Sequence, residues 1–219
     1  IRAGVSCKRR IPVEPGALRR QGGNPGSMHD SVVASTDWLA ERLADEDADV
    51  TVVDVRDAWE YDGIGHLPGA VNVPFDRFRA ADGDDAGMLP GVDRWADLLS
   101  EAGVANGDTL VAYDDTHGVF AARFLVTAEL YGHDDCRLLD GDFSAWTREQ
   151  ETTTEVPTVE PTTYEAAKPV GGPLVDREAV ERAAEDDETA LVDARSPAEY
   201  ADGHIPGAVN LEWTDNVDP

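Results

Sequence analysis

The chain has 219 residues, with 45 Asp or Glu against 18 Lys or Arg, which gives a formal charge of −27 at pH 7 and a pI near 4.2. A surface so acidic repels nucleic-acid phosphates, so we do not expect the protein to bind nucleic acid. No apolar run reaches the roughly 18 residues of a membrane span, so we expect no membrane insertion and a cytoplasmic location. The 41% hydrophobic composition excludes a collagen-like or wholly disordered chain. Cys7 and Cys136 have no disulfide or metal-site spacing, and the sequence shows neither a Gly-rich phosphate loop nor a metal-ligand cluster, so no metal or cofactor is expected.

The first 29 residues differ in composition from the rest of the chain. They hold six basic side chains and one acidic side chain, with several Gly and Pro and no apolar periodicity, so we interpret residues 1–29 as a disordered basic leader. In the remaining chain Lys168 is the only lysine. This balance resembles proteins of salt-in halophiles, and the alternative is a merely acidic protein. In either case stability should rise with salt, because low ionic strength leaves like charges unscreened.

After the leader, helical and strand-like patterns alternate along the chain. In order, they are a helix with an N-cap at Thr36, a strand over 50–55, a helix over 92–99, a strand over 109–113, a helix over 120–131 that ends at Gly132, and a strand over 136–139. The strand runs are continuously apolar, which is typical of strands buried on both faces. This order predicts an α/β fold with a parallel sheet, helices on both faces, and any ligand site at the carboxyl ends of the strands.

One motif occurs twice in the chain. Residues 53–72 read VDVRDAWEYDGIGHLPGAVN, and residues 192–210 read VDARSPAEYADGHIPGAVN with one residue fewer. The offset between them is 139 residues at the Asp of the motif and 138 at the His, which is the size of a domain. We therefore predict a first domain over 30–146 and the start of a second copy over 174–219. The Thr-, Glu- and Pro-rich residues 147–173 are interpreted as an extended linker.

The repeated pattern VDxR, EY and GHxPGAxN resembles the rhodanese domain of sulfurtransferases. The tandem layout is similar to that of thiosulfate or 3-mercaptopyruvate sulfurtransferases, and the segments YDDTHGVFAARF and LLDGDFSAW extend the resemblance through the first copy. It implies a rhodanese-like parallel sheet in two tandem copies, of which the second is incomplete here. It also implies a silent first domain, and an active second domain with a cysteine at the start of the loop after its central strand.

The corresponding loop of the first copy comprises Asp114, Asp115, Thr116, His117 and Gly118. Its first residue is Asp rather than Cys, and a carboxylate cannot carry a persulfide. Two carboxylates would also repel an anionic sulfur donor from the loop amides. We therefore expect this active-site-like loop to be catalytically silent. His117 is expected to be an ordinary solvent-exposed loop histidine.

The second copy contains no counterpart of this loop. Adding the offset of 139 to position 114 places the nucleophile at about residue 253, beyond Pro219, so we expect no catalytic residue in the chain and no activity from it alone. We interpret the chain as a fragment whose second copy is too short to close its own core. Its apolar residues, Val192 and Val209 among them, would lack partners unless the first domain covers them. Cys136 is expected to be a buried, inert thiol.

The polar residues of the repeated motif are expected to be structural: Asp54, Arg56 and His66 in the first copy, and Asp193, Arg195 and His204 in the second. Each His precedes a Pro-Gly turn, where an imidazole commonly binds local backbone. The i, i+4 spacing predicts ion pairs from Arg56 to Glu60 and from Arg195 to Glu199. Asp54 and Asp193 are expected to cap a helix or, alternatively, to orient the loop.

Two classes of function remain open at this point. The resemblance implies an enzyme that takes sulfane sulfur from a small anion and passes it to a thiophilic acceptor such as cyanide or a thiol. The alternative is a pair of silent domains that act as a binding or regulatory module. Glu199 stands where thiosulfate-specific relatives have a basic residue, which weakens the case for thiosulfate as the donor. Related loop-cysteine phosphatases are disfavoured by the tandem layout, and the sequence does not indicate an oligomeric state.

Overall fold

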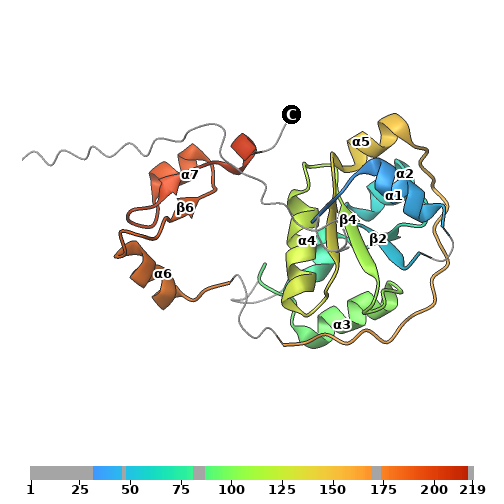
Figure 1. The fold of residues 1–219 in the computed structure, drawn as a ribbon, viewed down its shortest axis with the longest axis horizontal. Coiled ribbons are helices and arrows are strands. Elements are labelled where there is room, and N and C mark those ends of the chain that lie inside the picture. Colours follow the sequence, from blue (N-terminus) through green and yellow to red (C-terminus); the bar gives the residue numbers. More distant parts are fainter. Residues whose placement is uncertain (1–31, 46–47, 81–86, 169–173, 217–219) are drawn as a thin grey trace, which may run out of the picture. The chain divides into compact units, whose positions relative to one another are not determined.

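The computed structural model describes residues 32–45, 48–80, 87–168 and 174–216, so the predicted basic leader lies outside the described residues (Figure 1). The first copy contains a five-stranded parallel sheet in the order β1-β5-β4-β2-β3. Its strands are β1 (Val33–Ala34), β2 (Val50–Asp54), β3 (Val71–Asn72), β4 (Thr109–Tyr113) and β5 (Cys136–Leu139). Each carboxyl end lies at the same edge of the sheet, as the alternating pattern of strands and helices predicts.

Helices cover both faces of this sheet, which confirms the predicted α/β class. The helices of the first copy are α1 (Thr36–Leu43), α2 (Ala58–Gly63), the 3-10 helix η1 (Phe75–Phe78), α3 (Val92–Glu101), α4 (Val119–Leu130) and α5 (Asp142–Glu149). One core cluster joins α3 and α4 to alternate residues of β2 and β4, such as Val53 and Ala112. A second cluster joins α1 and α5 to the intervening residues Val52 and Val111. Neighbouring side chains of a strand point to opposite faces, so the middle of each central strand is apolar on both faces, and polar residues stand only near the strand ends.

The start of α1 differs by one residue from the prediction. The N-cap is Ser35, whose hydroxyl accepts a hydrogen bond from the Trp38 amide at 3.2 Å, and Thr36 is the first helical residue. Both residue types are good N-caps, so the sequence alone does not separate them. The Thr36 hydroxyl instead donates to the Glu149 carboxylate at 2.9 Å, which links α1 to α5.

The second copy repeats the first part of this arrangement. It comprises α6 (Arg177–Ala184), β6 (Val192–Asp193), α7 (Pro197–Asp202), β7 (Val209–Asn210) and the 3-10 helix η3 (Trp213–Asn216). The parallel pairing of Val192 with Val209 in β6 and β7 reproduces that of Val53 with Val71 in β2 and β3. In the first copy the other edge of β2 is occupied by β4, whereas within residues 174–216 the sheet has two strands only. Val192 and Val209 are accordingly 56% and 57% exposed, as expected.

The stretch interpreted as a linker is packed against the first copy over most of its described length. Helix α5 continues to Glu149, past the expected domain boundary at residue 146. Residues 151–167, which we call the strap, then run extended along the first copy. Thr153 forms an antiparallel bridge with His66, and the Ala167 amide donates to the Tyr131 carbonyl at 2.8 Å. The strap is therefore held by the first copy near both of its ends.

None of the helices in the described ranges is long and apolar enough to cross a lipid bilayer.

Candidate active site

The loop after β4 is organised around one buried carboxylate. Asp114 is 0% exposed and follows the last residue of β4 directly. Four backbone amides donate to it: Thr116 (2.7 Å) and Gly118 (2.8 Å) to Oδ1, and Phe120 (2.8 Å) and Ala121 (3.0 Å) to Oδ2. These donors lie on the loop and in the first turn of α4, where amides and the helix dipole favour a negative charge. A side chain of the chain itself therefore supplies the anion that these amides bind.

The backbone of the loop explains its residue types. His117 and Gly118 both adopt left-handed conformations, with φ of 57° and 80°. A Cβ on Gly118 would lie 3.0 Å from Leu138 Cδ2, so glycine is needed both for its φ and for space. The side chain of His117 is exposed, as predicted, while its amide donates to Asp142 Oδ2 at 3.1 Å. The conformation of the loop thus turns its backbone amides toward hydrogen-bond acceptors, while the imidazole of His117 faces solvent.

Asp142 is a residue of this site that we did not predict. It is 6% exposed at the start of α5, has a left-handed φ of 56°, and accepts from the Ser144 amide as well as from His117. The Phe143 amide in turn donates to the Asp114 carbonyl at 2.9 Å. The segment LLDGDFSAW carried the signal, because Asp after Gly at the start of a helix commonly binds nearby amides.

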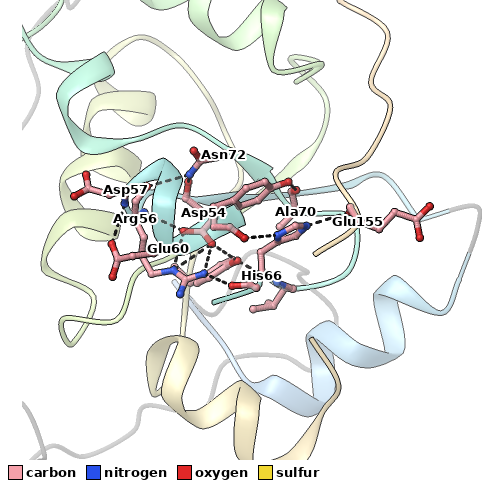
Figure 2. A network of polar contacts seen from close by, with 12 residues as sticks. Asp54, Arg56, Asp57, Glu60, His66, Ala70, Asn72 and Glu155 are labelled. Atoms are coloured by element: carbon pink, nitrogen blue, oxygen red, sulfur yellow. Dashed lines mark hydrogen bonds and ion pairs between the residues drawn. The ribbon is translucent and has the colours of Figure 1, made fainter. Parts of the chain in front are cut away.

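Asp54 and Arg56 form a buried ion pair at the carboxyl end of β2 (Figure 2). Arg56 Nη2 lies 2.6 Å from Asp54 Oδ2, the two side chains are 1% and 0% exposed, and the same Nη2 donates to the Gly65 carbonyl at 2.8 Å. The predicted pairing of Arg56 with Glu60 is therefore wrong. Helix α2 begins only at Ala58, so helical i, i+4 spacing does not apply to Arg56. Glu60 Oε2 instead accepts from the Asp57 amide in a capping box.

Asp54 does not cap a helix, because the N-cap of α2 is Asp57. Its Oδ2 accepts from the hydroxyl of Tyr113, the last residue of β4, at 2.6 Å, and that hydroxyl accepts from the Leu67 amide at 3.1 Å. Burial, followed by the charge of Asp54, raises the pKa of Tyr113, so the hydroxyl remains a donor. Since Asp114 follows Tyr113 directly, the alternative expectation that Asp54 orients the loop is consistent with this contact.

The guanidinium of Arg56 is enclosed by aromatic rings. Its central carbon lies 3.8 Å from the centroid of Phe143 and 5.6 Å from that of Tyr113. Burial alone would lower the pKa of Arg56, but the hydrogen bond and charge of Asp54 outweigh it and raise the pKa. Arg56 is consequently a fixed cation beneath the loop and is not available as a proton donor.

His66 is held by the backbone on both sides of its ring. Nδ1 lies 3.0 Å from the Tyr61 carbonyl oxygen and Nε2 lies 3.2 Å from that of Glu155, and the ring stacks on Tyr61 with centroids 3.7 Å apart (Figure 2). The residue is 0% exposed. A neutral imidazole has one N–H and donates to one of these two carbonyls. The contacts support a structural role, because the ring is packed on Tyr61, lies against backbone carbonyls at both nitrogens and does not face solvent.

The second copy repeats these contacts at its own Asp and Arg. Arg195 Nη2 lies 2.7 Å from Asp193 Oδ2 and donates to the Gly203 carbonyl at 2.8 Å, matching Arg56 within 0.1 Å. The ring of His204 stacks on Tyr200 at 3.8 Å, and His204 Nδ1 lies 2.8 Å from the Tyr200 carbonyl oxygen. The hydrogen bond from Arg195 lowers the pKa of Asp193. The motif therefore encodes one local structure twice.

The expected pairing of Arg195 with Glu199 is also wrong, for the same reason as in the first copy. Glu199 Oε2 accepts from the Ser196 amide at 3.1 Å and the Ser196 hydroxyl oxygen accepts from the Glu199 amide at 3.3 Å, which forms the capping box of α7. The Ser196 hydroxyl also donates to Glu199 Oε2 at 2.6 Å. The Arg195 side chain is 48% exposed, against 1% for Arg56. Within residues 174–216 no element supplies the covering that Tyr113 and Phe143 give Arg56.

Cys136 lies in β5 and is 7% exposed, as expected of a buried thiol. Burial, with smaller contributions from the charges of Glu129 and nearby aspartates, raises its pKa to about 12. A thiol with so high a pKa is almost wholly protonated at neutral pH and is a poor nucleophile.

Comparisons with known proteins agree with this architecture. The family described as "Rhodanese-like domain" matches residues 35–149 and 176–219. The thiosulfate sulfurtransferase of Corynebacterium glutamicum is 33% identical over 87% of this chain and 68% of its own length. The sulfur carrier protein TtuD of Thermus thermophilus is 33% identical over 89% of this chain and 74% of its own length. Among solved structures, the 3-mercaptopyruvate sulfotransferase SseA of Escherichia coli matches with a TM-score of 0.73 and 27% identity, covering 86% of this chain and 77% of that one.

Proposed function

The chain belongs to the rhodanese-like family, and on that premise we propose that its protein moves sulfane sulfur from thiosulfate or 3-mercaptopyruvate to cyanide or a thiol acceptor. The observation that carries the proposal is the repetition of the Asp-Arg network in the second copy, where Asp193 and Arg195 reproduce the contacts of Asp54 and Arg56. In the first copy this network lies directly beneath the loop after β4. We propose that in the second copy it supports the equivalent loop, which carries the nucleophile.

The chemistry requires a cysteine thiolate at that loop. The thiolate attacks the outer sulfur of thiosulfate, the S–S bond breaks, and sulfite leaves with the electron pair, so the enzyme holds a persulfide. Cyanide then attacks the outer sulfur, thiocyanate forms, and the thiolate is regenerated. With 3-mercaptopyruvate the C–S bond breaks and pyruvate leaves as its enolate, which takes up a proton. The protein itself carries the sulfur, so no cofactor enters the proposal.

We place the nucleophile at about residue 253, the sum of 114 and the repeat offset of 139. The chain of 219 residues would then be a fragment without activity of its own. Three features support this reading: Asp114 stands at the equivalent position of the first copy, β6 has no counterpart of β4 within residues 174–216, and Val192 and Val209 are exposed. Cys136 is no substitute nucleophile, because burial keeps its thiol protonated. We propose a cytoplasmic location for the protein.

The donor is expected to be less restricted to thiosulfate than in relatives with a basic residue at position 199. The hydrogen bonds from Ser196 lower the pKa of Glu199, so this side chain is an anion at neutral pH. An anion near the donor site disfavours the dianion thiosulfate more than the monoanion 3-mercaptopyruvate.

A non-catalytic binding module is the second candidate, and the first copy itself favours it. Two amides of the loop and two of the first turn of α4 are occupied by Asp114 instead of a substrate anion. If the second copy has an Asp or Ser at the equivalent position, both copies are silent.

Determining the coding sequence for about 100 codons past Pro219 identifies this residue. Formation of thiocyanate from thiosulfate and cyanide should then require the extended chain and disappear when the loop cysteine is replaced by serine. The 219-residue chain, with Cys136→Ala as its control, should form no persulfide after incubation with thiosulfate. A non-cysteine residue at the loop, or persulfide on the 219-residue chain, would contradict the proposal.

A further inference from the structure

The strap is fastened to the first copy by a buried pair of rings. Tyr164 of the strap and His133, which lies between α4 and β5, are each 3% exposed. Their rings are nearly parallel, with centroids 5.9 Å apart and an interplanar angle of 13°. His133 Nδ1 lies 3.1 Å from the Tyr164 hydroxyl, and Nε2 lies 3.0 Å from the Asp108 carbonyl oxygen. The buried imidazole therefore contacts the strap through Nδ1 and the loop before β4 through Nε2.

These partners define the protonation state of His133. A carbonyl oxygen only accepts, so Nε2 carries the hydrogen and donates to Asp108, while Nδ1 accepts from the Tyr164 hydroxyl. Adding a proton to Nδ1 would leave the Tyr164 hydroxyl without this acceptor and would place a charge in an enclosed site. A protonated Nδ1 could still donate to the Tyr164 oxygen, so it is the cost of a charge in this enclosed site that makes the closed strap favour the neutral imidazole.

The charged groups around His133 oppose one another. Asp108, on the loop before β4, and Asp134 and Asp135, which precede β5, favour the protonated ring. Burial disfavours the protonated ring, and its effect is larger than that of these charges, so the pKa of His133 lies below its ordinary value of 6.5. Releasing Tyr164 would return water to the ring and remove the main cause of this lowering.

We propose that acidification releases the C-terminal third of the strap, residues 162–167, from the first copy, with His133 as the group that takes up the proton. Protonation is more favourable in the released state, and by linkage a lower pH shifts the population toward that state. The ratio of released to closed strap rises at most tenfold for each unit by which the two pKa values of His133 differ. The contacts that open include the hydrogen bonds from the Thr162 amide to Ser100 O (3.1 Å), from the Tyr164 amide to Ser100 Oγ (3.0 Å) and from the Ala167 amide to Tyr131 O (2.8 Å). The two hydrogen bonds between Asn106 and the backbone of Glu165 open with them.

Cys136 provides an internal probe of this release. It is buried in the same core cluster as Tyr164, and the two side chains are close enough to interact electrostatically. Removing Tyr164 should therefore expose the thiol. This use of Cys136 is independent of the proposed sulfur transfer.

The experiment uses the 219-residue chain with Cys7→Ser, so that Cys136 is the only thiol, at constant high ionic strength. Its rate of reaction with 4,4′-dithiodipyridine, which modifies thiols at acidic pH, is measured between pH 7.5 and 5.5 and divided by the rate of glutathione at each pH. We expect the normalised rate to rise several-fold on acidification. The Thr162, Tyr164 and Ala167 amides should lose protection from hydrogen exchange over the same range, while the amides of β4 retain theirs.

His133→Gln keeps a donor and an acceptor but does not titrate, so its normalised rate should not change with pH. The matched control His117→Gln removes an exposed histidine and should behave as the parent chain does. A second measurement needs no variant: the midpoint of the rate increase should coincide with the titration of the His133 ring followed by NMR. A flat rate in the parent chain, an equal rise in His133→Gln, or a midpoint away from the His133 titration would each overturn the proposal.

Discussion

At the scale of single residues, the two Asp-Arg pairs show how burial changes the contribution of an ion pair to stability. Their geometry is the same, but the Arg and Asp side chains are 1% and 0% exposed in the first copy and 48% and 11% exposed in the second. A buried carboxylate that loses its partner keeps its full desolvation cost, whereas Asp193, whose partner Arg195 is half-exposed, regains water when that partner is removed. The pair in the first copy should therefore matter far more for stability.

Replacing Arg56 by Met, which retains much of the side-chain volume, should lower the free energy of unfolding by about 3–5 kcal/mol, because Asp54 is left as an uncompensated buried charge. The measurement is urea unfolding at constant high salt, followed by tryptophan fluorescence. Arg195→Met removes the same contacts at the exposed site and is the matched control, for which we expect a much smaller loss. Equal losses of unfolding free energy in the two variants would show that burial does not determine how much the pair contributes to stability.

Asp114 should be essential for the stability of the loop after β4. Asp114→Asn replaces an anion by a dipole whose NH₂ group faces backbone amides, and we expect a loss of about 2 kcal/mol or more in unfolding free energy. Asp115→Asn removes the same charge from the exposed neighbour. Because the charge of Asp115, after burial, raises the pKa of Glu60, this control should be neutral or slightly stabilising. If both variants lose the same free energy of unfolding, the change in net charge, and not the loss of the four hydrogen bonds from backbone amides, accounts for the lower stability.

At the scale of elements, the strap depends on glycines beneath it. Gly103 has a φ of +75°, and a Cβ there would lie 3.1 Å from Val159 Cβ and 3.3 Å from the Glu160 carbonyl oxygen. Gly103→Ala should lower the unfolding free energy by about 1–2 kcal/mol through backbone strain and close contact. Gly107 has nothing within 4 Å of the same position, so Gly107→Ala should change stability by no more than about 0.5 kcal/mol. Thermal unfolding of both variants tests this difference, and similar melting temperatures would contradict it.

The sequence predicted the central elements well and the peripheral ones poorly. Strands β4 (Thr109–Tyr113) and β5 (Cys136–Leu139) have the predicted bounds, because strands buried on both faces are mostly apolar and stand out from the polar loops beside them. The two-residue strands β1 and β3 and the short helix α2 are too brief to show a period. The packing of the strap was not predicted, because hydrogen bonds from irregular backbone to distant carbonyls leave no periodic signal.

The polar network was predicted in its members but not in its contacts. The repeated motif identified Asp54, Arg56 and His66, yet i, i+4 spacing gave Arg56 the wrong partner because that spacing applies only within a helix. Tyr113 is separated from Asp54 by 59 residues in sequence, and only the register of β2 with β4 brings the two side chains together. Contacts of this kind follow from the fold rather than from local patterns.

At the scale of the whole molecule, charge imbalance is the dominant feature. With 45 acidic and 18 basic side chains, at least 27 carboxylates have no basic partner in a one-to-one pairing. The folded state brings these carboxylates closer together than the unfolded chain does, so their mutual repulsion opposes folding. Salt weakens this repulsion, because the Debye length falls from ~30 Å at 0.01 M to ~8 Å at 0.15 M and ~3 Å at 1 M.

The melting temperature should therefore rise steeply with KCl at low concentration and more slowly above about 0.5 M, where screening already acts over a few ångströms. NaCl should give the same curve at equal ionic strength, since screening does not distinguish the cations, and sucrose at equal osmolality should not reproduce the steep part. A lower pH that protonates part of the carboxylates should flatten the curve by reducing the charge to be screened. A melting temperature that stays constant or falls between 0.05 and 1 M salt would show that the acidic surface does not destabilise the fold, and that its carboxylates are far enough apart to be solvated independently.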